Sequence, residues 1–207
     1  MDLLVATQNA GKKREYRHLL APLVTAGTRL YFPDDLGINI YVPEDQNTYV
    51  SNARQKAEAY LQATGMIALA DDSGLEVDAL HGAPGAHSAR YAPGPDTNRV
   101  TVLLSHLRSV PWEERTARFR CLIVVTTPDG TFHQAEGVCE GYIALSPAGK
   151  GGFGYDPVFY LPDYGCTMAE LSFAEKNRIS HRARAVEAAL PTLLDLAKQQ
   201  EKSVSRG

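Results

Sequence analysis

Apolar residues along the chain form short runs between turn residues, and these runs alternate with stretches of helical periodicity. Short apolar runs bounded by turn residues are typical of strands, whereas apolar spacings of three and four are typical of helices. Strands are predicted at Leu3–Ala6, Arg29–Phe32, Ile67–Ala70, Leu75–Leu80, Ala117–Thr127, Thr131–Leu145 and Val158–Leu161. Helices are predicted at Lys12–Leu20, Thr48–Thr64, Asp96–Leu107 and from Ser172 to Ala197, with a break near Asn177 to Ser180.

Turn and capping residues set the predicted boundaries. Gly65 ends the second helix, Asp96 or Thr97 caps the third, and Ser172 with Glu175 has the form of a capping box. The turn at 128–130 joins two strands into a long hairpin. Loops are expected at 33–47, 82–95 and 147–154, and a frayed polar tail from Gln199.

Strand–helix alternation at the start, a long hairpin in the middle and a helix at the end predict an α/β fold with a mixed sheet. The chain shows no internal repeat, low-complexity tract or convincing linker. We therefore expect a single domain over residues 1–207. The same pattern is compatible with a domain made of two lobes with a cleft between them.

Composition narrows the class of protein. The net charge of −3 gives no electrostatic case for a protein that coats nucleic acid or binds DNA. Three scattered cysteines without a C-x-x-C motif argue against a disulfide framework and a zinc site, and fit a reducing cytosol. We expect neither a signal peptide nor a transmembrane helix, and hence a cytoplasmic protein.

The most informative motif is the pair Asp71-Asp72, which follows the apolar run 66–69. Carboxylates at the end of a buried strand are costly unless they have a role, and that edge of an α/β sheet is where ligands bind. Alternation along the strand would direct the two side chains to opposite faces. Carboxylate ligation without histidine indicates Mg²⁺. The structural alternative is an Asx turn completed by Ser73 and Gly74.

A second candidate site lies at the first strand–turn–helix junction. Backbone N–H groups at a helix start, with small polar side chains and a lysine, suit a phosphate. The spacing of a Walker P-loop is absent, and the alternative is an ordinary turn with surface lysines. The residues concerned are Thr7, Gln8, Asn9, Ala10, Gly11 and Lys12.

A third group combines a loop carboxylate, Glu44, with Asn52 and Lys56, which lie four positions apart on the following helix. Such a group could hold a metal and a phosphate. A solvated helix face is the alternative.

The segment 151–157 places glycines around Phe153, which allows close backbone approach and exposes a ring face for stacking on a base. Asp156, which precedes a proline, is expected to be extended and exposed. The alternative is a hairpin loop with a core phenylalanine.

Lys176, Ser180, His181 and Arg182 supply cationic and donor groups near the start of the last helix, where they could read an anion or a carbonyl. The alternative is a basic helix end. A phosphate cradle, a carboxylate-held metal, a stacking aromatic and a basic clamp together are the components of a nucleotide hydrolase.

These motifs, in this order, resemble the inosine triphosphate pyrophosphatase or Ham1-like family, and its bacterial branch most closely. The resemblance rests on 70–78, 82–85, 88–91, 151–157 and 180–182. It implies an elongated mixed sheet with flanking helices, two lobes around a central nucleotide-binding cleft, and a homodimer. The implied reaction is Mg²⁺-dependent hydrolysis of ITP, dITP and XTP to the monophosphate and pyrophosphate, which clears deaminated purines.

The resemblance also implies residue roles. Asp72 would be the general base and a Mg²⁺ ligand, with Glu44 as a second ligand. The segment from Thr7 to Lys12 would hold the triphosphate, and Lys56 and Ser73 would contact the substrate. The residues expected to form the base pocket are Phe153, Gly154, Tyr155, Asp156, Lys176, His181 and Arg182.

Two other functions fit the same components. A Maf-like pyrophosphatase would prefer modified pyrimidine or 7-methylguanosine nucleotides, and substrate ranking separates it from the first hypothesis. A purine-nucleotide sensor would bind without turnover, although a sensor has less need of the acidic pair.

Overall fold

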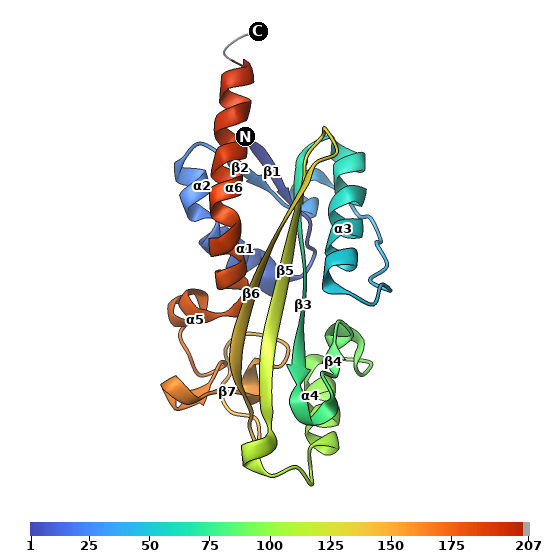
Figure 1. The fold of residues 1–207 in the computed structure, drawn as a ribbon, viewed down its shortest axis with the longest axis vertical. Coiled ribbons are helices and arrows are strands. Elements are labelled where there is room, and N and C mark those ends of the chain that lie inside the picture. The colour runs from blue at the N-terminus through green and yellow to red at the C-terminus, as the bar shows by residue number, and fades with distance from the viewer. Residues whose placement is uncertain (205–207) are drawn as a thin grey trace. The chain divides into compact units, whose positions relative to one another are not determined.

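The computed structural model describes residues 1–204, with side chains to residue 200 (Figure 1). Its contacts divide the chain into two compact units. Unit 1 comprises 1–72, 122–137 and the chain from Ala183 onward, and unit 2 comprises 73–121 and 138–182. Strands β3 (Ile67–Val77), β5 (Thr116–Thr126) and β6 (Phe132–Ile143) each contribute residues to both units.

The strands follow the order β2-β1-β3-β5-β6-β7-β8, and β4 pairs with β3. Strand β1 is parallel to β2 and β3, whereas β7 is antiparallel to β6 and β8. This confirms the predicted mixed sheet of an α/β protein. The strands are β1 Asp2–Val5, β2 Arg29–Tyr31, β3 Ile67–Val77, β4 Pro84–Gly85, β5 Thr116–Thr126, β6 Phe132–Ile143, β7 Phe159–Leu161 and β8 Cys166–Thr167.

The helices flank the strands. They are α1 Ala10–Leu19, α2 Ala21–Thr25, α3 Tyr49–Thr64, α4 Asp96–His106, α5 Phe173–Ile179 and α6 His181–Val204. Within the described residues, no helix combines the length and apolar character that a membrane span requires.

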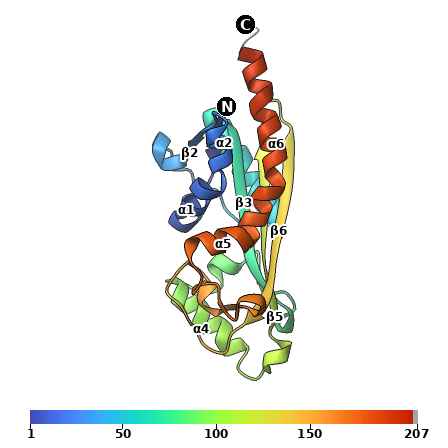
Figure 2. The ribbon, with the colours of Figure 1, turned by 90° about the vertical axis from the view of Figure 1, so that its left-hand side faces the viewer.

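The core of unit 1 is formed by α3 against the strands. Ala53, Ala57 and Tyr60 of α3 pack on Leu4 of β1, with Ala68, Ala70, Leu122 and Val124 in the same cluster. Helices α1, α2 and α6 lie on the other side of these strands (Figures 1 and 2). Both faces of β1 are covered, which explains its uninterrupted apolar run.

The core of unit 2 lies between α4 and the sheet. Val100 and Leu103 of α4 and Leu107, its C-cap residue, are buried and follow helical spacing. They share one cluster with residues of the sheet, including Leu75, Val77, Ala117, Phe119, Ile143 and Phe159.

The structure corrects the predicted strand boundaries around the acidic pair. Residues 67–77 form one continuous strand, so Asp71 and Asp72 lie inside β3, and the turn expected at 71–74 is absent. The Asx-turn alternative is therefore wrong. Both aspartates are buried, at 1% and 4% exposure, because ion pairs and hydrogen bonds from other elements compensate their charge.

Other boundaries also differ from prediction. Helix α1 begins two residues earlier than Lys12, α4 has Pro95 rather than Asp96 or Thr97 at its N-cap position, and α2 and β8 were not predicted. Helix α6 continues to Val204, beyond the predicted end and into the tail expected to fray, while 205–207 lie outside the described residues. The predicted break is confirmed, since Ser180 separates α5 from α6.

The capping box at α5 is confirmed and gives a testable stability effect. The Ser172 hydroxyl accepts a hydrogen bond from the Glu175 N–H, and the Glu175 carboxylate accepts one from the Ser172 N–H. Ser172→Ala is expected to lower the free energy of unfolding by about 1 kcal/mol, measured by urea denaturation. Ser105→Ala, in the exposed part of α4, is the control and should change it by less than about 0.5 kcal/mol. Equal effects would contradict the capping role.

Candidate active site

The residues predicted for the site fall into two groups, one in each unit. Thr7, Gln8, Asn9, Ala10, Gly11, Lys12, Glu44, Lys56 and Asp72 belong to unit 1. Ser73, Phe153, Gly154, Tyr155, Asp156, Lys176, His181 and Arg182 belong to unit 2. The contacts within each unit show what each group can do.

The first turn of unit 1 is organised by its own side chains. Asn9 caps α1, since its Oδ1 accepts a hydrogen bond of 2.9 Å from the Lys12 N–H. The Thr7 hydroxyl accepts a hydrogen bond of 3.3 Å from the Asn9 N–H. The Lys12 ammonium lies 2.9 Å from Asp71 Oδ2, so the alternative of a surface lysine is wrong at this position.

The Gln8 side chain makes a contact within unit 1. Its amide donates to Asn39 Oδ1 over 3.0 Å. This side chain connects the turn to the loop that precedes α3.

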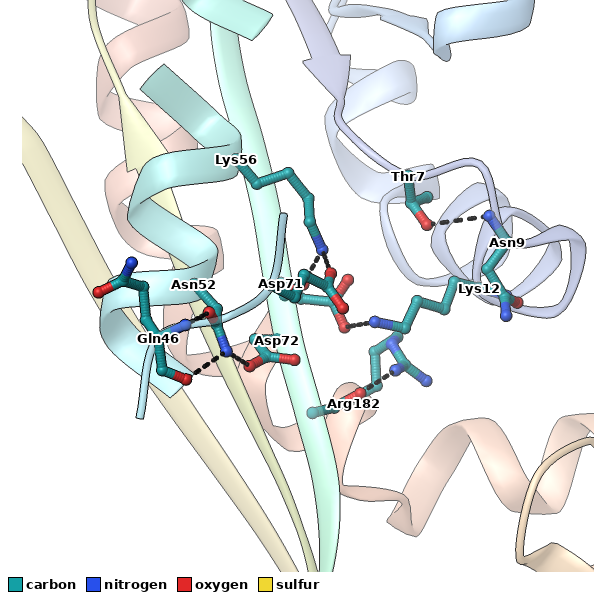
Figure 3. A network of polar contacts seen from close by, with 11 residues as sticks. Thr7, Asn9, Lys12, Gln46, Asn52, Lys56, Asp71, Asp72 and Arg182 are labelled. Atoms are coloured by element: carbon teal, nitrogen blue, oxygen red, sulfur yellow. Dashed lines mark hydrogen bonds and ion pairs between the residues drawn. The ribbon is translucent and has the colours of Figure 1, made fainter. Parts of the chain in front are cut away.

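The two aspartates lie on opposite faces of β3, as alternation predicted (Figure 3). Asp71 pairs with Lys12 of α1. Asp72 Oδ2 accepts a hydrogen bond of 2.8 Å from Asn52 Nδ2 of α3. Because β1 pairs with β3 only as far as Leu69, both carboxylates lie just beyond the carboxyl end of β1. That position is where α/β sheets place ligand-binding residues.

Helix α3 adds a cation and an amide to this group. The Lys56 ammonium forms an ion pair with Glu44 and donates a hydrogen bond of 3.2 Å to the Asp71 carbonyl (Figure 3). Asn52 is completely buried. The alternative of a solvated helix face is therefore wrong for this part of α3.

Burial and nearby charges shift the pKa values in this group. Burial raises the pKa of the Asp72 carboxyl above its ordinary value, against the lowering effects of Lys12 and the Asn52 hydrogen bond, and the Glu44 charge adds to the rise. Burial lowers the pKa of Lys56, but Glu44 and Asp71 outweigh burial and raise it. Asp72 is thus a stronger base than an exposed aspartate, next to a firmly protonated lysine.

The carboxylates of Asp72 and Glu44 are the groups that could hold a metal. Hard oxygen donors suit Mg²⁺, which typically takes one or two protein carboxylates and completes its coordination with water and phosphate oxygens. A cation there would relieve the repulsion by which Glu44 raises the pKa of Asp72. Across the described residues, no group of three or more His, Cys, Asp or Glu side chains is arranged to hold a metal by itself. The donor set therefore fits Mg²⁺ only together with a phosphate ligand and water.

In unit 2, two cationic side chains lie over the ring of Phe153. Lys176 Nζ lies 4.6 Å from the ring centroid and the Arg182 guanidinium carbon 5.8 Å. The ring is partly exposed. This arrangement places donor groups beside an aromatic surface, which suits a polar flat ligand such as a base.

The prediction that Asp156 is extended and exposed is wrong. It is 2% exposed and begins a short 3-10 helix, Asp156–Val158. Its carboxylate pairs with Lys176 and accepts a hydrogen bond of 2.8 Å from the Phe153 N–H. Gly152, at φ +69°, leaves room for that carboxylate, where a Cβ would clash with it.

Two further residues of this group, Tyr155 and Gly154, are held by contacts within unit 2. Tyr155 is in the hydrophobic core, and its hydroxyl donates to the Ser88 carbonyl over 2.9 Å. The Gly154 N–H donates to Asp96 Oδ2 over 2.5 Å. Sequence reasoning missed the contact with Asp96, because it considered this residue only as a helix cap.

His181 and Arg182 are both buried. The His181 ring stacks on Phe119 with centroids 4.7 Å apart, and Arg182 Nη2 donates to Ser73 Oγ over 3.0 Å. The alternative of an exposed basic helix end is therefore wrong for these two residues. What each group in unit 2 does toward a substrate stays a prediction.

Buried carboxylates and partly buried lysines lie beside a helix start at the end of a strand in a mixed α/β sheet. These features are typical of a class of proteins suited to phosphate-bearing ligands. The chain belongs to the Ham1 family, whose model matches residues 3–192. The resemblance predicted from the motifs is thereby confirmed.

The chain is similar over nearly its whole length to bacterial proteins named dITP/XTP pyrophosphatase. It is 49% identical to the one from Desulforamulus reducens, covering 97% of this chain and 100% of that protein. It is 43% identical to the one from Bacillus subtilis, covering 90% and 93%. The solved structure of a HAM1 protein from Coxiella burnetii matches with a TM-score of 0.83 and 39% identity, over 94% of this chain and 98% of that one.

Proposed function

We propose that this chain is a nucleoside triphosphate pyrophosphatase that hydrolyses dITP, XTP and ITP to the monophosphate and pyrophosphate. The observation that carries the proposal is Asp72, a buried carboxylate with a raised pKa beside two lysines. The names of its relatives support the substrate class. Removal of deaminated purines from the nucleotide pool would be its role.

Asp72 accepts a proton from a water molecule, whose oxygen attacks the α-phosphorus. The bond from the α-phosphorus to the bridging oxygen breaks, and pyrophosphate leaves. Lys12 and Lys56 stabilise the charge that develops on the phosphate oxygens. Mg²⁺, held by Asp72 and Glu44 together with the phosphates, would supply further positive charge there.

The base would be recognised by the residues gathered at Phe153. Its ring would stack on the purine, and Lys176, His181 and Arg182 would donate hydrogen bonds to the 6-oxo group. Adenine presents an amine at that position, so a donor-rich site disfavours it. Ser73 would contact the substrate, and Gly154, Tyr155 and Asp156 would shape the pocket in a nucleotide-binding cleft.

The proposal extends to domain organisation, cellular location, oligomeric state and partners. Residues 1–207 would form one pyrophosphatase domain, the enzyme would be cytoplasmic, and it would act as a homodimer without nucleic acid or membrane partners. Light scattering on the purified chain tests the dimer.

The deciding experiment is a Mg²⁺-dependent turnover assay with dITP, XTP, ITP, ATP and GTP that resolves pyrophosphate from orthophosphate. Pyrophosphate release from the first three, with ATP and GTP nearly inert, is the expected result. Orthophosphate release, or binding without turnover, would refute the proposal. A preference for modified pyrimidine or 7-methylguanosine nucleotides, added as further substrates, would favour a Maf-like activity.

Lys56→Ala is expected to raise KM for dITP by about tenfold to a hundredfold, because a charge-assisted contact to phosphate contributes about 1.5–3 kcal/mol. Steady-state kinetics at saturating Mg²⁺ measure the effect. Lys198→Ala, an exposed lysine in unit 1, is the control and should leave KM unchanged. An unchanged KM and kcat in the Lys56 variant would refute its phosphate role.

The raised pKa of Asp72 predicts how its carboxyl group titrates when no metal is bound. In the metal-free protein its carboxyl should lose its proton at a higher pH than an ordinary aspartate, because burial disfavours the charged form. Carbon-13 NMR of the carboxyl groups measures this, with Asp72→Asn identifying the signal. Adding Mg²⁺ together with a non-hydrolysable dITP analogue should lower the pKa, since a cation favours the carboxylate. A titration at or below the ordinary value in the metal-free protein would count against the burial argument.

A further inference from the structure

Asn52, the fourth residue of α3, is a polar side chain with no exposed surface. Its amide makes three hydrogen bonds. Nδ2 donates to Asp72 Oδ2 over 2.8 Å and to the Gln46 carbonyl over 3.3 Å. Oδ1 accepts from the Gln46 N–H over 3.0 Å. One side chain thus uses both donors and its acceptor on two separate segments (Figure 3).

The two segments are those that carry the acidic residues of unit 1. Gln46 lies two positions after Glu44 in the loop before α3, and Asp72 lies on β3. The helix itself is fixed at its start, where Thr48 Oγ1 accepts a hydrogen bond from the Ser51 N–H. Asn52 therefore connects the loop that carries Glu44 with the carboxylate of Asp72 through a capped helix.

An amide is the group that this position requires. A carboxylate would present oxygen to both Asp72 and the Gln46 carbonyl, and an apolar side chain would leave Asp72 without this donor in a buried setting. A donor on one oxygen of Asp72 also restricts rotation of the carboxylate. Outer partners of this kind orient the groups that bind a metal or carry out the reaction.

Lys56 lies one helical turn after Asn52 and binds the other carboxylate, Glu44, by an ion pair. The same face of α3 thus binds Glu44 directly through Lys56. It also binds Gln46, in the loop that carries Glu44, through Asn52. Loss of Lys56 removes a charge from the site, whereas loss of Asn52 removes hydrogen bonds to Asp72 and Gln46 and leaves the number of charged side chains unchanged. The two roles can therefore be separated by experiment.

We propose that Asn52 is a positioning residue that orients the Asp72 carboxylate and the Glu44 loop for metal binding and turnover. The inference rests on the proposed function, because it assigns Asn52 to the same site. Asn52 acts through Asp72 and Gln46 rather than on the substrate.

The test compares wild type with Asn52→Ala and Asn52→Leu, the second of which fills the volume that the first leaves empty. Ala57→Gly is the matched control, since Ala57 is buried on the same helix and a helical glycine costs stability of about 1 kcal/mol. Thermal unfolding establishes that each variant is folded. Titration calorimetry then measures Mg²⁺ affinity in the presence of a non-hydrolysable dITP analogue, and steady-state kinetics give kcat and KM.

Both Asn52 variants should bind Mg²⁺ about tenfold to a hundredfold more weakly and lose kcat by a similar factor, with KM for the nucleotide little changed. The Ala57 variant should lose stability alone. Wild-type metal affinity and kcat in a folded Asn52 variant would overturn the proposal, as would a loss of stability alone.

Failure of the proposed function gives a different result. Wild type would then release no pyrophosphate from dITP, XTP or ITP, while the calorimetric comparison still decides whether Asn52 orients the carboxylates. Wild type that turns over normally beside equally active Asn52 variants would refute the positioning role and leave the enzymatic function standing.

Discussion

Asp72→Asn is expected to lower kcat for dITP by about a thousandfold while nucleotide binding persists. An amide cannot accept the proton of the attacking water, and general-base catalysis contributes about a hundredfold to ten-thousandfold. The variant should keep its fold, because an amide oxygen can still accept the hydrogen bond from Asn52 Nδ2. Single-turnover kinetics measure the loss, and equilibrium binding of a non-hydrolysable dITP analogue measures what remains.

The same substitution should stabilise the protein at neutral pH. A carboxyl whose pKa is raised by folding adds stability only while it is protonated, and this stability is lost as the pH rises through the folded pKa. An asparagine resembles the protonated form at every pH. The free energy of unfolding of the variant should therefore exceed that of wild type near pH 7, and the difference should shrink below the pKa of Asp72.

Asp45→Asn is the matched control, because Asp45 is an exposed carboxylate in the loop beside Glu44. It should change neither turnover nor stability appreciably. Near-normal kcat in the Asp72 variant would refute its role as the base. A stability no greater than that of wild type at pH 7 would show that burial does not penalise this carboxylate.

Helix α3 shows what could be predicted from the sequence. Its cap at Thr48, its left-handed Gly65 and its apolar spacing are local signals, and the structure has the helix within one residue of the prediction. The capping box and the break at Ser180 were predictable for the same reason. Elements with local signals need no knowledge of distant contacts.

The predictions that were wrong concern charged residues whose charge is compensated by residues distant in the sequence. Asp-Asp-Ser-Gly is typical of a turn, yet β3 continues through it because Lys12 and Asn52 satisfy the two aspartates. A residue before a proline is typically extended, yet Asp156 is buried because it forms an ion pair with Lys176 of α5. Neither partner is near in sequence, so local rules could not predict the burial. Conflicts of this kind between local and global preference are expected at functional sites.

The motifs predicted residues for a candidate site but not how their side chains are held. Phe153 and Lys176 were both predicted for the base pocket, but not the cation–π contact between them. Asn52 was predicted to accompany Lys56, but not to bind Asp72 and Gln46 at once. Such geometry depends on the crossing of elements that are far apart in the chain.

Lys176→Met is expected to lower the free energy of unfolding by about 3–5 kcal/mol, the largest stability effect that we predict. The Lys176 and Asp156 side chains are only 5% and 3% exposed and form an ion pair. Removing the cation takes the Lys176 ammonium away from a buried carboxylate, which costs far more than a surface ion pair contributes. Urea denaturation of wild type and variant, at a pH where carboxylates are ionised, measures the difference.

The double variant Lys176→Met, Asp156→Asn separates charge from packing. An asparagine at 156 removes the buried charge and keeps an oxygen that can accept the Phe153 N–H, so most of the lost stability should return. Lys150→Met, an exposed lysine in unit 2, is the control and should have little effect. If the double variant is no more stable than Lys176→Met, the loss comes from packing around the lysine stem, and the buried carboxylate is not its cause.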